Sequence, residues 1–153
     1  MSKLVISIVA YKHSKKDLEK AINSCISNAY FAKIFIIDNS PIDKLKNELE
    51  EYPIDYFYNP SNPGYGAAHN FVIKKSIEEG SKYHLVLNPD VNFKSGTFEK
   101  LIEFMDNNPD IGNVMPKVYY PDGSLQYLCK LLPTPYDWIG RRFNPFKNMV
   151  EKR

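Results

Sequence analysis

The sequence of 153 residues has few cysteines and no long apolar run. Cys25 and Cys129 are far apart and match no metal-ligand spacing, and no signal peptide is recognisable at the amino end. We therefore expect reduced thiols and a cytoplasmic protein. No stretch approaches the roughly 18 consecutive apolar residues of a membrane span. The chain is expected to be soluble or, at most, peripheral on the inner face of the cell membrane.

The sequence also lacks an excess of charge of one sign. Its formal net charge is +2, which gives no indication of a nucleic-acid partner. Several basic residues gather at the end of the chain: Arg141, Arg142, Lys147, Lys152 and Arg153. Such a tail can contact anionic lipid or an acidic partner, but a solvated terminus is the preferred interpretation. Nothing in the composition fixes the oligomeric state, and a homo-oligomer stays open.

Short apolar runs alternate with amphipathic stretches. Runs rich in β-branched residues are typical of strands buried on both faces of a parallel sheet, and they predict strands at residues 3–10, 32–38, 54–58 and 83–88. Residues 111–119 predict a further strand, bent or at an edge because of Pro116. A turn is expected at residues 120–123.

Apolar residues spaced by three and four predict helices between these strands. The first follows Ser14 and places Cys25 on its apolar face. The second is expected to start at Ser40-Pro41, with Ile42, Leu45 and Leu49 on one face. A third runs from a glycine-rich loop to about Glu79, and a fourth surrounds residues 98–105.

This alternation predicts an α/β protein with a doubly wound, mostly parallel sheet. The regular pattern extends over residues 1–131, which we expect to form one domain. In residues 132–153 the periodicity is lost, and this segment is expected to be an irregular C-terminal arm.

Two carboxylates follow buried strands, where open α/β sheets bind their ligands. Asp38 could accept hydrogen bonds from a base or ribose, or form an Asx-turn or helix cap. Asp90, in Asn88-Pro89-Asp90, is suited to Mg²⁺ or Mn²⁺, which take substrate phosphate oxygens as further ligands. The alternative is again a simple turn.

The glycine-rich loop, residues 62–70, leads straight into a helix. Small residues let the backbone approach a ligand, and a helix N-terminus favours anions. The loop lacks the third glycine of a dinucleotide fingerprint and the Lys-Ser/Thr of a phosphate loop. Asn70 shares a predicted face with Ile73 and Ile77 and is expected to point inward. His69 could reach a ligand, but a solvated surface position is slightly favoured.

Five ordered blocks carry a resemblance to a known family: residues 5–11, 36–40, 62–70, 87–91 and 122–126. Together they resemble the N-terminal, donor-binding portion of an inverting family-2 glycosyltransferase with the Rossmann-like GT-A fold. The most similar subgroup is the rhamnosyltransferase-like enzymes of bacterial surface-polysaccharide synthesis, including that of lipopolysaccharide. The resemblance implies a nucleoside diphosphate sugar as donor and a glycan or lipid-linked glycan as acceptor.

The resemblance also implies roles for single positions. Ala10 and Tyr11 would line the nucleobase pocket, and Asp38 would bind the base of a UDP- or dTDP-sugar. Asp90 would ligate Mg²⁺ or Mn²⁺ on the donor diphosphate, in a motif whose first acid is replaced by Asn88. The other residues implied in donor binding are Asn62, Gly64 and Asn70 in the loop, and Gln126 near the donor sugar or the acceptor.

The sequence departs from the family pattern in its catalytic base. Family members usually continue for roughly another hundred residues, which contain the acceptor region and a Glu-Asp motif. Nothing after Gln126 resembles that motif, so the general base stays unassigned and the chain is expected to be truncated. Two alternatives stay open: an inactive nucleotide-sugar-binding module, and an unrelated α/β domain acting as an interaction scaffold.

Overall fold

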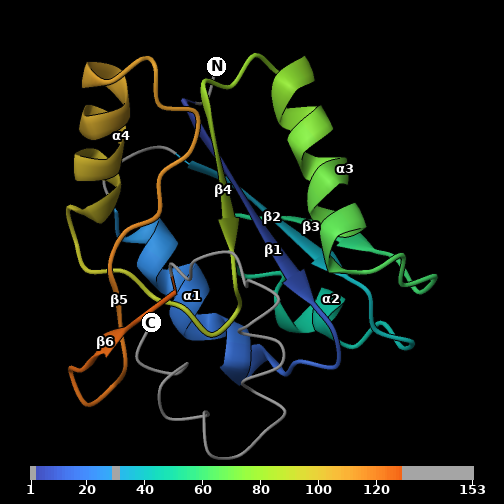
Figure 1. Cartoon of the computed structure of the whole chain (residues 1–153). Helices are drawn as coiled ribbons and strands as arrows, with labels where there is room; N and C mark the ends of the chain where they lie inside the picture. The colour runs from blue at the N-terminus through green and yellow to red at the C-terminus, as the bar shows by residue number, and fades with distance from the viewer. Residues whose placement is uncertain (1–2, 29–31, 129–153) are drawn as a thin grey trace, which may run out of the picture. The chain divides into compact units, whose positions relative to one another are not determined.

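The computed structural model describes residues 3–28 and 32–128. Its centre is a parallel sheet of four strands in the order β3-β2-β1-β4 (Figure 1). The strands are β1 (Leu4–Ala10), β2 (Ala32–Asp38), β3 (Asp55–Tyr58) and β4 (Tyr83–Leu87). All four were predicted from their apolar runs, and the fold class is confirmed. From β1 the chain first builds outward through β2 and β3, then returns to place β4 on the other side of β1.

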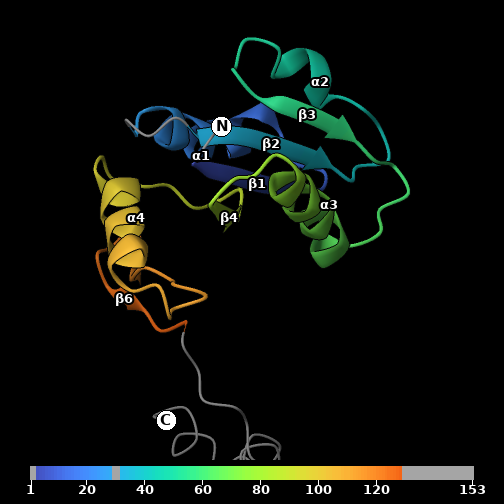
Figure 2. The ribbon, with the colours of Figure 1, turned by 90° about the horizontal axis from the view of Figure 1, so that it is seen from above.

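Among the described residues, four helices cover the two faces of the sheet (Figure 2). They are α1 (Lys15–Ile26), α2 (Leu45–Glu48), α3 (Tyr65–Glu78) and α4 (Thr97–Asn107). Because side chains alternate along a strand, β1 contributes buried side chains to the cores on both faces of the sheet. Ile6 and Ile8 pack with residues of α1, α2 and α4. Val5 and Val9 pack with Ala68 and Val72 of α3.

The first helix forms as its sequence predicts. The Asp17 carboxylate accepts a hydrogen bond of 2.8 Å from the backbone N–H of Ser14, at the start of the helix. Leu18, Ile22 and Cys25 are buried on its inner face. Cys25 is 2% exposed, which confirms it as a core residue, and this burial raises the pKa of its thiol to about 12.

Two predicted elements are shorter than expected. The helix expected from Ser40-Pro41 begins only at Leu45, and Ile42 is exposed, although Leu45 and Leu49 are buried as predicted. Ser40 does not cap a helix, because its hydroxyl accepts a hydrogen bond from the Lys12 N–H. The strand expected over residues 111–119 was also wrong, since only β5 (Val118–Tyr119) pairs with another strand.

Contacts divide the chain into two compact units, residues 1–112 and 113–153. The second unit contains an antiparallel hairpin of β5 and β6 (Leu125–Gln126), joined by the predicted turn. Gly123 in this turn has a φ of +85°, which favours glycine. The predicted domain boundary after residue 131 and the basic tail lie outside the described residues. In the part that is described, no helix is long and apolar enough to cross a membrane.

Candidate functional site

The carboxyl ends of β1, β2 and β4 lie at one edge of the sheet, because the strands are parallel. The order of the strands reverses between β1 and β4. In open α/β sheets such a reversal leaves room for a ligand beyond the strand ends. The residues just beyond these three ends therefore form the candidate site, which lies within the first unit.

Two hydrogen bonds fix the ends of β1 and β2 to each other. Asn39 donates its backbone N–H to the Ala10 carbonyl at 2.9 Å. Lys12 donates its N–H to Oγ of Ser40 at 2.7 Å. Ala10 is fully buried, whereas Tyr11 is 46% exposed. The predicted pocket residue Tyr11 is thus accessible to a ligand, and its backbone is held from both sides.

Asp38, the last residue of β2, is fully buried. Its Oδ1 atom accepts a hydrogen bond of 2.9 Å from the Ser40 N–H, which is the Asx-turn that the sequence left open. Its Oδ2 atom accepts one of 2.8 Å from the Tyr56 hydroxyl. Each carboxylate oxygen keeps a further lone pair. Contact between Asp38 and a nucleobase stays a prediction.

The Tyr56 hydroxyl also lies 2.8 Å from Oδ1 of Asp43. Burial, followed by these two hydrogen bonds to carboxylates, raises the pKa of Tyr56 far above its ordinary value. The phenol therefore keeps its proton, and its single O–H lies within hydrogen-bond distance of two carboxylates, which share it at the end of β2. Neither Tyr56 nor Asp43 was predicted from the sequence as part of the site.

The glycine-rich loop and the Asn-Pro-Asp turn meet through Tyr65, the first residue of α3. Its hydroxyl donates a hydrogen bond of 2.6 Å to Oδ1 of Asn88. Partial burial, and secondarily the charge of Asp90, raise the pKa of Tyr65. Asn88 and Asp90 are both exposed beyond the end of β4. Sequence reasoning missed Tyr65, although an aromatic residue between two glycines was a visible signal.

The start of α3 depends on backbone that favours glycine. Gly64 precedes the helix with a φ of +94°, and Asn62 has a φ of +44°. Asparagine and glycine are the residues that adopt positive φ at least cost. These two predicted site residues therefore have a structural role in the loop, whether or not they contact a ligand.

The predicted positions of Asn70 and His69 were wrong. Asn70 is exposed, and Ile77 is 70% exposed. The buried face of α3 instead contains Ala68, His69, Val72 and Ser76. His69 is buried because its Nδ1 atom lies 2.7 Å from the Ser7 hydroxyl in the middle of β1. Asn70 can contribute to a site only from the outer surface of α3.

The structure thus brings Tyr11, Asn88 and Asp90 to the ends of neighbouring strands and joins the glycine loop to them. Gln126 lies in β6, in the second unit. Among the described residues, no group of three or more His, Cys, Asp or Glu side chains could hold a metal ion. Asp90 is the one exposed carboxylate of the Asn-Pro-Asp turn.

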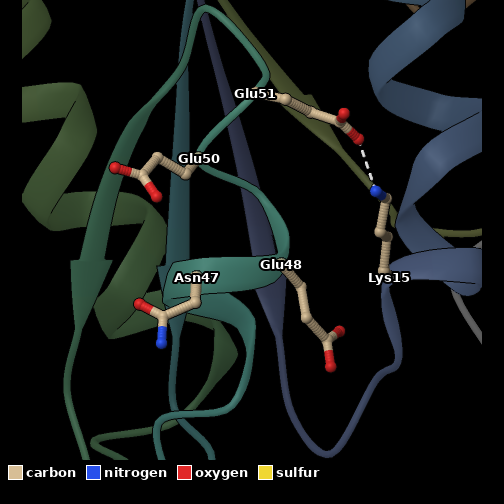
Figure 3. Close-up of a pocket in the computed structure, with 5 residues that line it drawn as sticks. All are labelled: Lys15, Asn47, Glu48, Glu50 and Glu51. Carbon is tan, nitrogen blue, oxygen red and sulfur yellow. Dashed lines mark hydrogen bonds and ion pairs between the residues drawn. The ribbon is translucent and has the colours of Figure 1, made fainter.

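An open pocket of about 460 Å³ lies elsewhere, beside the first residue of α1 and the α2 segment (Figure 3). Its lining residues are Lys15, Asn47, Glu48, Glu50 and Glu51. The Glu51 carboxylate points to the Lys15 ammonium and forms an ion pair with it. This leaves two further glutamates in the lining. Such a surface repels a diphosphate, and none of the predicted site residues lines it.

A parallel α/β sheet with an acidic residue beyond β4 and a glycine loop beside it has a Rossmann-like architecture. Comparison with known families identifies it further. The chain belongs to Glycosyl transferase family 2, whose model matches residues 5–151. This confirms the family that the five sequence blocks indicated.

Individual relatives agree with this family. The chain is 29% identical over 145 residues to an uncharacterized glycosyltransferase, MJ1057, of Methanocaldococcus jannaschii. That match covers 89% of this chain and 49% of the relative. The chain therefore spans about half the length of this curated relative.

The fold is also similar to crystal structures of S. aureus TarS residues 1–349. The TM-score is 0.56 at 16% identity, over 70% of this chain and 33% of the TarS chain. A second TarS structure, in complex with UDP, gives a TM-score of 0.55 at 16% identity with the same coverage. These similarities confirm the GT-A-like fold.

Proposed function

We propose that this chain binds a nucleoside diphosphate sugar, UDP- or dTDP-linked, as the donor of an inverting glycosyltransferase. The hydrogen bond between Tyr65 and Asn88 is the observation that carries the proposal. It joins the glycine loop to the Asn-Pro-Asp turn at the strand ends beside β1. A fold similar to that of UDP-bound TarS supports a uridine nucleotide as the first ligand to test.

In this proposal the nucleoside lies over the ends of β1 and β2. The exposed Tyr11 ring offers an apolar surface for the base, and Ala10 forms the floor. Asp38 accepts a hydrogen bond from the base, either directly or after Tyr56 moves. The loop residues Asn62 and Gly64 approach the ribose. Asn70 reaches it only from the outer side of α3.

The diphosphate lies at the Asn-Pro-Asp turn, where Asp90 would hold Mg²⁺ or Mn²⁺ with Asn88 beside it. A single exposed carboxylate fits these ions, because they keep several waters and take phosphate oxygens as ligands. A bound ion would neutralise negative charge on the leaving diphosphate. The Tyr65 hydroxyl orients the Asn88 amide, since it donates to Oδ1.

Transfer forms a bond between an acceptor hydroxyl oxygen and the anomeric carbon and breaks the bond from that carbon to the diphosphate. The acceptor proton passes to a general base, which we assign to no residue of this chain. The resemblance favours a glycan or lipid-linked glycan of surface-polysaccharide synthesis as the acceptor. The most specific reaction that it implies is the transfer of a rhamnosyl group. Gln126 is proposed to lie near the donor sugar or this acceptor. Peripheral membrane association and self-association stay predictions.

Thermal unfolding with UDP and with dTDP, each with and without Mn²⁺, tests donor binding. A ligand at 100 times its Kd stabilises the folded state by about 2.7 kcal/mol, so a clear rise in Tm is expected for at least one nucleotide. No shift with either nucleotide contradicts the proposal and favours an interaction scaffold. A transfer assay with the bound donor then separates an enzyme from a binding module, because only the enzyme consumes the donor.

A further inference from the structure

We propose that Lys12 binds the diphosphate of the donor through its ammonium group. The inference rests on the proposed function and adds a residue to that site. Lys12 lies two residues after the end of β1, the strand beside which the sheet order reverses. It is exposed at the same edge as Asn88 and Asp90.

The backbone of Lys12 is held in a conformation that lysine rarely adopts. Its φ is +58°, in the left-handed region that favours glycine and asparagine. The hydrogen bond from its N–H to Ser40, whose side chain is buried, fixes this conformation. The neighbouring Tyr11 N–H donates to Nδ1 of His13 at 3.0 Å and completes the tight loop. Glycine or asparagine would serve this backbone better, so the lysine side chain itself needs an explanation.

The ammonium group of Lys12 is available to an anion. Its Nζ atom lies 5.1 Å from the centre of the Tyr11 ring, in a cation–π contact. Within residues 3–28 and 32–128, Lys12 takes part in no ion pair. The lysines that form ion pairs there are Lys3, Lys15, Lys33, Lys75 and Lys82. The charge therefore stands at the strand ends beside an exposed aromatic ring, where the nucleotide is proposed to bind.

The charge balance of the site makes a lysine useful there. A nucleoside diphosphate carries several negative charges, and the Asn-Pro-Asp turn supplies one carboxylate, Asp90, to hold a divalent ion. A lysine acts as a point charge toward phosphate and needs no fixed geometry. Lys12 would attract the diphosphate even in the absence of a metal ion.

Binding of UDP and uridine, and of dTDP and thymidine, to the full chain in EDTA tests this role. Lys12→Asn removes the charge but keeps a residue that tolerates positive φ, so folding is preserved. We expect it to weaken diphosphate binding about tenfold, the effect of one charge-assisted contact, and to change nucleoside binding less than twofold. Lys12→Arg should restore most of the lost diphosphate affinity. In 0.5 M salt, the difference in diphosphate affinity between the unmodified chain and Lys12→Asn should become smaller.

Lys20→Gln is the matched control, because it removes the same charge from an exposed position on α1. It should leave every Kd unchanged. The proposal is overturned if Lys12→Asn leaves diphosphate binding intact, or if it weakens nucleoside and diphosphate binding equally. If the unmodified chain binds neither UDP nor dTDP, the proposed function itself fails, and the role of Lys12 fails with it.

Discussion

The Oγ atom of Ser7 lies 2.7 Å from Nδ1 of His69, so a buried hydrogen bond joins β1 to α3. The same hydroxyl lies 2.8 Å from Nε2 of His84 in β4. A hydroxyl donates one hydrogen, so one imidazole accepts from Ser7 while the other donates to it. The remaining ring nitrogens are buried without a partner in the described structure. Burial without a charged partner favours the neutral form and lowers the pKa of both imidazoles.

We expect the chain to lose stability as the pH falls from about 6.5 to about 4. Burial, with a smaller contribution from His84, lowers the pKa of His69 to about 4, whereas an unfolded histidine has a pKa of about 6.5. In this window the unfolded state binds the proton and the folded state does not, so the free energy of unfolding decreases. The decrease is at most about 3 kcal/mol from His69. Urea unfolding at several pH values measures it.

His69→Gln should reduce this pH dependence, because it removes a group that the unfolded state protonates in this pH range and the folded state does not; the buried His84 keeps its own contribution. Asn70→Ala is the control, since the neighbouring side chain is exposed; it should keep the original slope. Equal slopes for all three proteins would show that the buried imidazole does not control acid stability.

Tyr56→Phe should destabilise the fold by about 1–2 kcal/mol. The change removes the O–H that donates to the buried Asp38 carboxylate, and an acceptor that loses its partner in the interior is costly. Tyr58→Phe is the matched control on the same strand, because no hydrogen bond of its hydroxyl occurs within the described residues. Urea denaturation of both variants gives the comparison. Equal stabilities would mean that water replaces the Tyr56 hydroxyl.

Periodicity predicted the sheet because its central strands, β1 and β2, are buried on both faces. All seven residues of β1 are buried, so an unbroken apolar run marks the strand. The carboxyl-edge position of Asp38 and Asp90 followed from the strand ends alone. The family resemblance then added what fold cannot supply, namely a class of ligand.

The errors have a common physical origin in polar side chains with partners far along the chain. His69 is buried because Ser7, 62 residues away, supplies a hydrogen bond. The Ser40 hydroxyl accepts a hydrogen bond from the N–H of Lys12, 28 residues away, and so is not available as a helix cap. The contact between Tyr65 and Asn88 also joins two separate motifs. Local spacing contains no information on such pairs.

Asp38 and Asp90 should have separable effects on nucleotide binding. Asp90→Ala is expected to abolish the gain in UDP affinity that Mn²⁺ provides and to leave metal-free binding unchanged. Asp38→Ala should weaken nucleoside binding with or without metal. Because Asp38 is buried and bonded to Tyr56, Asp38→Asn is the variant of similar shape that guards against misfolding. Calorimetric titration with uridine and UDP distinguishes the two effects, and intact binding in all three variants would refute the assigned site.

The Asp106 carboxylate should contribute to thermal stability from the opposite edge of the sheet. Hydrogen bonds from Lys3 at 2.6 Å, Lys82 at 2.5 Å and Tyr83 at 2.6 Å join α4 to the starts of β1 and β4. These bonds hold the pKa of Asp106 well below its usual range. The stabilisation is therefore complete above the unfolded pKa of about 3.9 and is lost as the pH falls below it.

Asp106→Asn is thus expected to lower the Tm at pH 7, and the difference from the unmodified chain should shrink at pH 3. High salt should also reduce this difference in Tm, because the ion pairs of Asp106 are partly exposed. Asp110→Asn, an exposed aspartate four residues further on, should leave the Tm unchanged at both pH values. A Tm for Asp106→Asn that matches this control at pH 7 would mean that packing of Phe98 and Ile102, and not the ion cluster, holds α4 on the sheet.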